Sequence, residues 1–381
     1  SNLEKLKNCL DNGGHYKVLI LTNSINGLYS FRRELIEELI NEKFEVYISS
    51  PVGYRKEYFE KLKCIFIETS IARHGLNPIS DLNLVFKYIK IIKKINPKVV
   101  LTYTIKPNIY GGIACRLLKV PYISNITGLG TAIENKGILQ KIALILYKLG
   151  LKKASCIFFQ NESNQKFFLD KQIVSGKTIL IPGSGVNLSH HCFEEYPCDN
   201  NKIKFLFIGR IMKDKGINEL LEAAIQIKAK FSNVHFDLIG DCEEDYNKCL
   251  QELQEQGIIK YHGRQNDVHP FIKESHAVIL PSYHEGMANV LLEAASTGRP
   301  VLASRVPGCQ ETFDDGVSGF GFEVKNVKSL VEAIIKFIEL PYEKKKEMGI
   351  AGRKKMEREF DRNIVVNAYL EEINRVIKNY K

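Results

Sequence analysis

The sequence predicts an α/β protein of two doubly wound, Rossmann-like domains, each a parallel sheet covered by helices on both faces. Three observations support this. A chain of 381 residues is long for a single core. Two successive series of short apolar runs alternate with helical patterns, as parallel sheets require. A polar stretch over residues 182–201 separates the two series and is the candidate linker. We expect ligands beyond the carboxyl ends of the strands, in a central cleft that the two domains face.

The first series begins with a strand at 17–22, a turn at 23–27 and a helix at 29–41. Further strands are predicted at 44–49, 64–67, 99–103, 122–126, 156–159 and 179–181, with helices that include 81–95 and 139–152. Strands of the second series are predicted at 203–208, 234–239, 258–262, 277–280, 301–304 and 319–322. From residue 341 the chain has a charged amphipathic helical pattern. We therefore expect domains at 1–185 and 186–360, and a helix at 361–381 that returns to the first domain.

The composition is that of an ordinary soluble protein, with 44% apolar and 26% charged residues. The sequence lacks the run of about 18 apolar residues that a transmembrane helix needs. Residues 1–16 also lack the apolar stretch of a secretory signal. Nine cysteines are scattered, and Cys64 and Cys156 lie within apolar runs, which favours reduced, buried thiols. We expect a cytoplasmic protein, with peripheral attachment to the cytoplasmic face of the inner membrane as the alternative.

Four potential metal ligands lie together in the linker: His190, His191, Cys192 and Cys198. Their spacing matches no zinc pattern, so a surface loop is the favoured interpretation. The sequence therefore predicts no metal site.

Positive charge is concentrated in the first half of the chain. Residues 1–190 hold 27 Lys and Arg against 14 Asp and Glu, whereas residues 191–381 hold 27 against 30. A basic half is compatible with nucleic acid, anionic lipid or phosphorylated substrates. A generally solvated, lysine-rich surface is the alternative.

One segment carries two carboxylates from a strand end into a helix. The apolar run 277–282 is followed by Glu285-Gly286, and Glu293 lies eight residues after Glu285, slightly over two helical turns. The N–H groups and dipole at such a helix start suit a phosphate. The segment thus favours a nucleotide-sugar site. Alternatively, Glu285 serves only the helix dipole and Glu293 is a solvated helical residue.

A second group follows the first strand of the second domain. Gly209 gives the backbone room to turn, and Arg210 and Lys215 place two cations beyond the strand end. Such cations can hold a diphosphate and offset its charge when it leaves. Solvated basic residues at a strand end are the alternative.

These segments resemble a known family. The second domain is similar to that of the retaining glycosyltransferases of family 4, which have the two-domain GT-B fold, and the first domain resembles it more loosely. The matching segments cover nearly all of residues 182–325: Phe207-Ile208-Gly209-Arg210, Lys213-Asp214-Lys215-Gly216, Leu238-Ile239-Gly240-Asp241, Tyr261-His262-Gly263, Pro281-Ser282, Glu285-Gly286, Glu293-Ala294, Gly298-Arg299-Pro300-Val301, and Gly308 with Glu311.

The resemblance implies roles at the donor side. Glu293 would accept hydrogen bonds from the ribose hydroxyls, and Glu285 would address the hydroxyls of the donor sugar. Arg210 and Lys215 would stabilise the leaving diphosphate. The remaining donor contacts would be made largely by main chain: the N–H groups of Met287, Ala288 and Asn289 toward the phosphates, and the loop of Gly263, Arg264 and Gln265 toward the base.

The first domain supplies further candidates. Gly27 lies in the turn where the family brings backbone close to the donor diphosphate, although many members have two glycines there and a plain turn glycine is equally compatible. Lys106 and Asn108 follow a strand and could reach an acceptor phosphate. Thr127 and Gly128 follow the next strand on the acceptor side, where many members carry a sugar-contacting histidine that this chain lacks.

The expected reaction uses no cofactor and no metal. The sequence has no Asp-x-Asp, so the metal-bridged diphosphate site of the other major glycosyltransferase fold has no support. The resemblance implies retention by same-face attack, with a donor phosphate oxygen taking the acceptor proton. It further implies a nucleotide-sugar donor, with UDP expected, carrying a hexose or N-acetylhexosamine. The acceptor would be a polyprenyl-diphosphate-linked glycan in capsule or lipopolysaccharide O-antigen assembly.

Two lysine-rich amphipathic stretches, 84–98 and 139–153, lie in the basic half. Such helices can rest on an anionic membrane, each basic residue contributing about 1 kcal/mol. Domain-packing helices with lysine-rich outer faces are the alternative.

Two other functions stay open: a GT-B nucleotide-sugar epimerase or phosphorylase, and a basic nucleic-acid-binding protein. No RNA-binding signature or Cys/His finger accompanies the second, so no nucleic acid partner is expected.

Overall fold

The computed structural model describes residues 15–72, 75–243 and 245–379. The chain forms two compact units: Ser1–Ile181 with Val366–Lys381, and Pro182–Val365. The predicted domain limits were residues 185 and 360, whereas the observed limits are residues 181 and 365. The second observed limit falls inside the last helix.

Unit 1 contains a seven-stranded parallel sheet of order β3-β2-β1-β4-β5-β6-β7. The apolar β-branched and aromatic content of these runs explains their strand conformation, because both faces of the sheet are covered. The strands are β1 (Lys17–Leu21), β2 (Glu45–Ser50), β3 (Ile65–Glu68), β4 (Val99–Tyr103), β5 (Tyr122–Ile126), β6 (Cys156–Phe159) and β7 (Thr178–Leu180).

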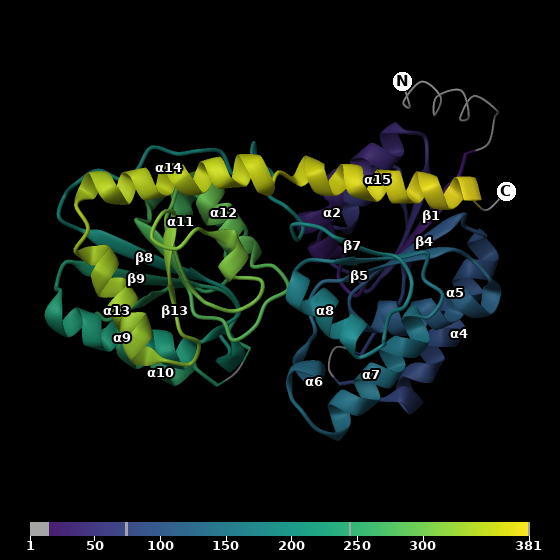
Figure 1. Cartoon of the computed structure of the whole chain (residues 1–381), viewed down its shortest axis with the longest axis horizontal. Helices are drawn as coiled ribbons and strands as arrows, with labels where there is room; N and C mark the ends of the chain where they lie inside the picture. The colour runs from purple at the N-terminus through teal and green to yellow at the C-terminus, as the bar shows by residue number, and fades with distance from the viewer. Residues whose placement is uncertain (1–14, 73–74, 244, 380–381) are drawn as a thin grey trace. The chain divides into compact units, whose positions relative to one another are not determined.

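The helices of unit 1 begin at side chains that cap them. Ser24, Asn77 and Asn161 accept hydrogen bonds from the first turns of α2, α4 and α8. The helices are α2 (Ile25–Asn41), α3 (Lys56–Lys61), α4 (Pro78–Ile95), the π-helix η1 (Pro107–Gly111), α5 (Gly112–Leu118), α6 (Thr131–Glu134), α7 (Ile138–Leu151) and α8 (Glu162–Asp170). In Figure 1, α4, α5 and α7 lie on one side of this sheet and α2 on the other.

The last helix, α15 (Arg362–Asn379), enters unit 1 from Val366 onward. There the Tyr369 ring stacks on Phe158, with 4.3 Å between centroids, and its hydroxyl donates to the Asn125 side chain. The buried guanidinium of Arg32 donates to the Tyr369 hydroxyl at 3.3 Å. The C-terminal residues therefore pack as part of unit 1.

Unit 2 contains a six-stranded parallel sheet of order β10-β9-β8-β11-β12-β13. The strand order reverses between the neighbouring strands β8 and β11. The loops that follow these two strands therefore lead to opposite sides of the sheet. In doubly wound sheets, ligands bind in the crevice between two such loops. The strands are β8 (Ile203–Ile208), β9 (Val234–Ile239), β10 (Lys260–Tyr261), β11 (Ala277–Leu280), β12 (Val301–Ser304) and β13 (Gly319–Phe322).

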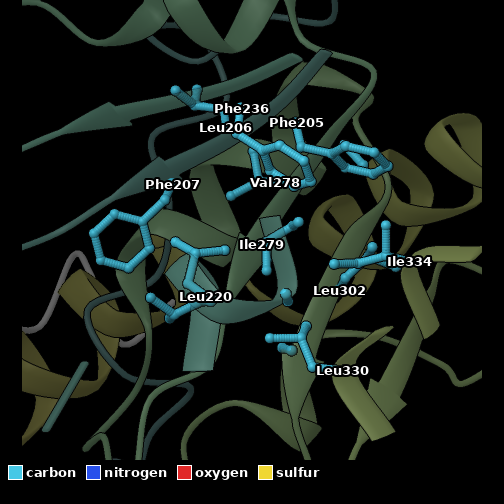
Figure 2. Close-up of a cluster of buried hydrophobic side chains, with 14 of the residues drawn as sticks. Phe205, Leu206, Phe207, Leu220, Phe236, Val278, Ile279, Leu302, Leu330 and Ile334 are labelled. Atoms are coloured by element: carbon cyan, nitrogen blue, oxygen red, sulfur yellow. The ribbon is translucent and has the colours of Figure 1, made fainter. Parts of the chain in front are cut away.

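Helices cover both faces of the second sheet (Figure 1). They are the 3₁₀ turn η2 (Lys213–Lys215), α9 (Ile217–Lys230), α10 (Asn247–Glu255), α11 (His269–Glu274), α12 (Asn289–Thr297), the 3₁₀ turn η3 (Gln310–Thr312), α13 (Val327–Ile338) and α14 (Tyr342–Glu359). Phe205, Phe207, Leu220, Ile279 and Ile334 are buried in its core (Figure 2). The predicted pair of doubly wound parallel sheets is confirmed.

Within the described residues, no helix combines the length and apolarity needed to cross a bilayer. All eight cysteines of this part of the chain are free. Burial raises the pKa of Cys64 and of Cys156 to about 12, as expected for structural thiols.

Candidate functional site

The loops that follow β8 and β11 meet at the point where strand order reverses in unit 2. The Lys215 ammonium donates a hydrogen bond of 2.5 Å to Oε1 of Glu285, and the Ser282 hydroxyl donates to the same oxygen at 2.8 Å. Lys215 and Glu285 are 19% and 15% exposed, so the pair is shielded but reachable. The structure thus brings together two residues that the sequence placed at one site.

A second contact runs between the same loops, one residue earlier in each. Nε2 of His284 lies 3.2 Å from Oδ2 of Asp214, and the backbone N–H of Tyr283 donates to the Asp214 carbonyl at 2.9 Å. Two consecutive residues of one loop therefore face two consecutive residues of the other. This arrangement fixes the position of Lys215 relative to Glu285.

Gly216 lets the loop after β8 approach the loop after β11 closely, and Gly308 does the same for the loop after β12. Gly216 has a φ of +74°, and a Cβ there would lie 2.0 Å from the Pro281 carbonyl oxygen. Gly308 has a φ of +86°, and a Cβ there would lie 2.4 Å from the Glu285 carbonyl oxygen. Both positions combine a left-handed backbone with contacts that exclude any side chain.

Helix α12 presents its N-terminus beside Glu285. It has no side-chain cap and no acidic residue in its first turn. The N–H groups of Met287 and Asn289 have no protein acceptor among the described residues, and the Asn289 Oδ1 is buried without a partner there. Unpaired donors and a helix dipole favour the binding of an anion. One prediction is wrong in this structure: the Ala288 N–H donates to the Gly308 carbonyl at 2.8 Å and is already satisfied.

Glu293 lies one helical turn further along α12. Its side chain is 21% exposed, and Oε1 is 3.7 Å from Nε2 of His191. Desolvation raises the pKa of the Glu293 carboxyl to about 7, and the charge of Arg362 opposes this rise. A desolvated carboxylate with a surface opening is suited to accept hydrogen bonds from hydroxyl groups.

The two arginines predicted at the donor side lie on the surface. Nη1 of Arg210 is 3.5 Å from Glu243, and Nη1 of Arg264 is 3.8 Å from Asp241. Arg210 would therefore have to leave Glu243 before joining Lys215 at a diphosphate. Gly209 follows β8 directly, and its N–H donates to the Ile239 carbonyl at 2.9 Å. Gly263 follows β10 with a φ of +66°.

Gly27 has a structural role that differs from the prediction. It lies in the first turn of α2, which begins at Ile25 rather than after a turn ending at residue 27. Its N–H donates to the Ser24 hydroxyl at 3.0 Å. Because this donor is satisfied by the helix cap, Gly27 does not offer it to a diphosphate.

Lys106 and Asn108 are buried and already have polar partners. The Lys106 ammonium is buried, 3.0 Å from Oδ1 of Asp81. The Asn108 side chain is buried as well; it accepts from the Thr102 hydroxyl at 2.7 Å and donates to the Asn125 carbonyl at 2.8 Å. The acceptor role stays a prediction for both residues, and either one would have to leave these buried partners to contact a phosphate.

Thr127 and Gly128 are half-buried in the loop that follows β5. Their placement on the acceptor side stays a prediction. Three residues that the structure adds to the site carry no spacing signal: His284, Asp214 and Gly308. His284 adjoins Glu285. Asp214, which adjoins Lys215, and Gly308 were noted only within the family pattern.

The two doubly wound parallel sheets are the architecture of the GT-B class. Two family models match the chain in tandem: "Glycosyl transferase 4-like" over residues 17–161 and "Glycosyl transferases group 1" over residues 192–355. The chain belongs to the glycosyltransferases built from these two domains.

Similar proteins agree with this assignment. The chain is 28% identical to the N,N'-diacetylbacillosaminyl-diphospho-undecaprenol alpha-1,3-N-acetylgalactosaminyltransferase of Campylobacter jejuni, over 95% of this chain and 100% of that one. It is 26% identical to an Escherichia coli UDP-Gal:alpha-D-GlcNAc-diphosphoundecaprenol alpha-1,3-galactosyltransferase, over 82% and 84%. The solved structure of Anabaena HepE with UDP-glucose has the same fold, with a TM-score of 0.75 at 20% identity, covering 96% of this chain and 100% of that one.

The predicted glycosyltransferase is thereby confirmed. The epimerase and nucleic-acid-binding alternatives receive no support from these similarities.

Proposed function

We propose that this enzyme moves a hexose or N-acetylhexosamine from a UDP-sugar to a polyprenyl-diphosphate-linked saccharide, with retention, in the assembly of a surface polysaccharide. The names of the two relatives support this proposal, since both describe α-1,3 transfer to a diphosphoundecaprenol-linked acceptor and one names a UDP-sugar. Both relatives are matched over more than four fifths of their length.

The single observation that carries the proposal is the Lys215–Glu285 pair beside the uncapped N-terminus of α12. The N–H groups of Met287 and Asn289 would hold the donor diphosphate, and Lys215 would turn from Glu285 to it. Glu285 would then be released toward the hydroxyls of the donor sugar. Glu293 would accept hydrogen bonds from the ribose. Each group meets the part of the donor that its charge suits.

In the proposed reaction, the acceptor hydroxyl oxygen forms a bond to the anomeric carbon while the bond from that carbon to the diphosphate oxygen breaks. The leaving phosphate takes the acceptor proton on the same face of the sugar. Lys215 and the α12 N-terminus offset the charge that develops on the leaving group. Since these groups can stabilise a diphosphate without a cation, we propose that transfer needs no metal.

We further propose that the outer side of α4 and α7 rests on an anionic membrane. Both helices contact α5 and η1, and they lie on one side of the first sheet (Figure 1). Large apolar side chains point to solvent from this side: Ile79 is 88% exposed, Ile138 77% and Phe86 61%. Exposed lysines accompany them, among them Lys87, Lys90, Lys93, Lys94, Lys141 and Lys148. A surface that combines exposed apolar side chains with lysines is suited to bind an acidic bilayer.

The test is a two-stage assay on the purified chain. Thermal shift with a panel of UDP- and GDP-sugars first selects the donor, since a bound ligand stabilises the fold. Mass spectrometry and NMR then follow transfer to a synthetic polyprenyl-diphosphate-linked saccharide. An α-linked product from an α-linked donor supports the proposal. Nucleotide-sugar binding without any acceptor extension, or a β-linked product, would refute it.

A further inference from the structure

Three potential metal ligands lie close together in unit 2, between the segment 192–194 and the start of α11. None of them is among the residues proposed for sugar transfer. Sγ of Cys192, Oε1 of Glu194 and Nε2 of His269 all lie within 4.8 Å of one another. Motif spacing could not reveal this cluster, because His269 begins α11, 77 residues after Cys192. The linker residues His190 and Cys198, considered with Cys192 in the sequence, are not part of it.

The spacing of the three atoms suits a tetrahedral ion. Sγ lies 3.5 Å from Oε1 and 4.0 Å from Nε2, and Nε2 lies 2.9 Å from Oε1. A zinc ion with bonds of about 2.0–2.3 Å separates such ligand atoms by about 3.3–3.6 Å. Each observed separation is within about 0.5 Å of that range, so small side-chain rotations would complete the geometry.

One buried arginine holds both segments that supply the ligands. The Arg299 guanidinium donates to the Glu194 carbonyl at 3.1 Å, to the Glu195 carbonyl at 2.7 Å and to the Lys273 carbonyl at 2.6 Å. Arg299 is fully buried. The linker and α11 are therefore fixed to each other before any ion binds, which reduces the entropy that binding costs.

The surroundings of His269 and Glu194 leave one atom of each side chain available to bind an ion. Nδ1 of His269 is buried, which leaves Nε2 for an ion. Oε2 of Glu194 lies 3.8 Å from the Lys273 ammonium, so Oε1 is the oxygen that faces the cluster. Cys192 is exposed, which leaves a fourth position open to water.

We propose that Cys192, Glu194 and His269 form a Zn²⁺ site with water as the fourth ligand. A thiolate, an imidazole and a carboxylate are the donor set of zinc, and the two anionic ligands balance the charge of the ion. No step of the proposed sugar transfer passes through this site.

Cobalt substitution tests this site directly. The reduced, metal-free full-length chain is titrated with Co²⁺, and the thiolate-to-cobalt charge-transfer band and the tetrahedral visible bands are recorded. We expect one equivalent to produce both, and added Zn²⁺ to abolish them. We also expect Zn²⁺ to raise the unfolding temperature, because the ion binds the folded chain. Wild-type protein that shows neither the bands nor the shift would overturn the proposal without any variant.

Matched variants locate the site. Cys192→Ser should remove the thiolate band, and His269→Gln should weaken Co²⁺ binding at least about 10-fold, since even outer-shell changes cost that much. Cys198→Ser and Cys249→Ser remove other exposed thiols and should leave the spectrum unchanged. Circular dichroism confirms that each variant is folded. A band that survives Cys192→Ser, or disappears in Cys198→Ser, would place the metal elsewhere and refute the proposed site.

Discussion

The Lys215 ammonium donates its hydrogen bond to the Glu285 carboxylate across the point where strand order reverses, and Asp214 faces His284 one residue earlier. The cation expected at the leaving diphosphate is therefore held by the carboxylate expected at the sugar. A donor phosphate has to compete with Glu285 for Lys215. We therefore expect the two residues to act together in the proposed reaction.

Substitution of this pair should lower turnover more than nucleotide affinity. Glu285→Gln and Lys215→Ala are each expected to reduce kcat about 10²–10³-fold, the usual effect of removing one electrostatic contact in a transition state. The double variant should lose little more than either single one, because the residues act together. Steady-state kinetics and UDP titration measure both effects. Lys344→Ala removes an exposed ion pair with Glu347 and serves as the control. Fully additive losses would contradict the coupling.

The raised pKa of Glu293 predicts a pH-dependent cost to stability. Its folded value is about 7 against an ordinary 4.5, so the folded protein binds this proton more tightly than the unfolded chain does. Stability is therefore lost as pH rises from about 4.5 through 7 and is constant above. Glu293→Gln should be more stable than wild type at pH 8 by about 1–3 kcal/mol and equal to it near pH 4. Denaturant unfolding at both pH values measures this difference.

The same substitution should weaken UDP binding, since a carboxylate accepts from ribose hydroxyls more strongly than an amide does. We expect UDP to raise the unfolding temperature of Glu293→Gln less than that of wild type. Equal shifts would remove Glu293 from the nucleotide site, whatever its effect on stability.

Gly216 should tolerate no side chain. Gly216→Ala combines a left-handed backbone, about 1–2 kcal/mol for alanine, with a Cβ placed 2.0 Å from the Pro281 carbonyl oxygen. We expect it to lose more than about 3 kcal/mol of unfolding free energy. Gly257→Ala is the matched control, because its φ is +71° and nothing lies within 4 Å of the added Cβ. Similar losses in the two variants would show that the backbone angle alone matters.

The Lys106–Asp81 pair should support the fold rather than the acceptor. Lys106→Ala leaves a buried carboxylate uncompensated and is expected to cost about 3–5 kcal/mol. Lys106→Met combined with Asp81→Asn removes both charges and should recover most of that loss. Thermal unfolding measures both variants. If the double variant is stable but has an acceptor KM raised 10-fold or more, Lys106 takes part in acceptor binding after all.

Membrane binding should depend on the outer side of α4 and α7. We expect the chain to float with liposomes that contain anionic phospholipid, and Ile138→Ser with Phe86→Ser to lower the bound fraction at least about 5-fold, since each buried aliphatic or aromatic side chain contributes on the order of 1.5–3 kcal/mol. Lys141→Glu with Lys148→Glu should act mainly at low salt. Leu180→Ser, at an exposed leucine on β7, is the control. Undiminished flotation of the first variant would refute this surface.

Much of the fold and of the donor site could be predicted because the relevant signals are local. The hydrophobic periodicity and the apolar composition of short segments identified the strands of both sheets. Glu285 and Lys215 were each predicted to follow a strand end of the second sheet, and the structure brings the two side chains into contact. What the sequence could not show is the pairing of polar groups. Lys106 and Asn108 lie at a strand end as the polar residues of a site would, but each is satisfied by a partner distant in sequence.

The sequence by itself determined the two-domain α/β architecture and the family, because hydrophobic period and short motifs depend only on near neighbours along the chain. Tertiary structure alone decided which polar groups are available. It satisfied the N–H groups of Gly27 and Ala288, paired Lys215 with Glu285 and placed His269 beside Cys192. Hydrogen bonds and desolvation depend on which atoms meet in space, and the strand order of a parallel sheet brings together residues that lie tens of positions apart.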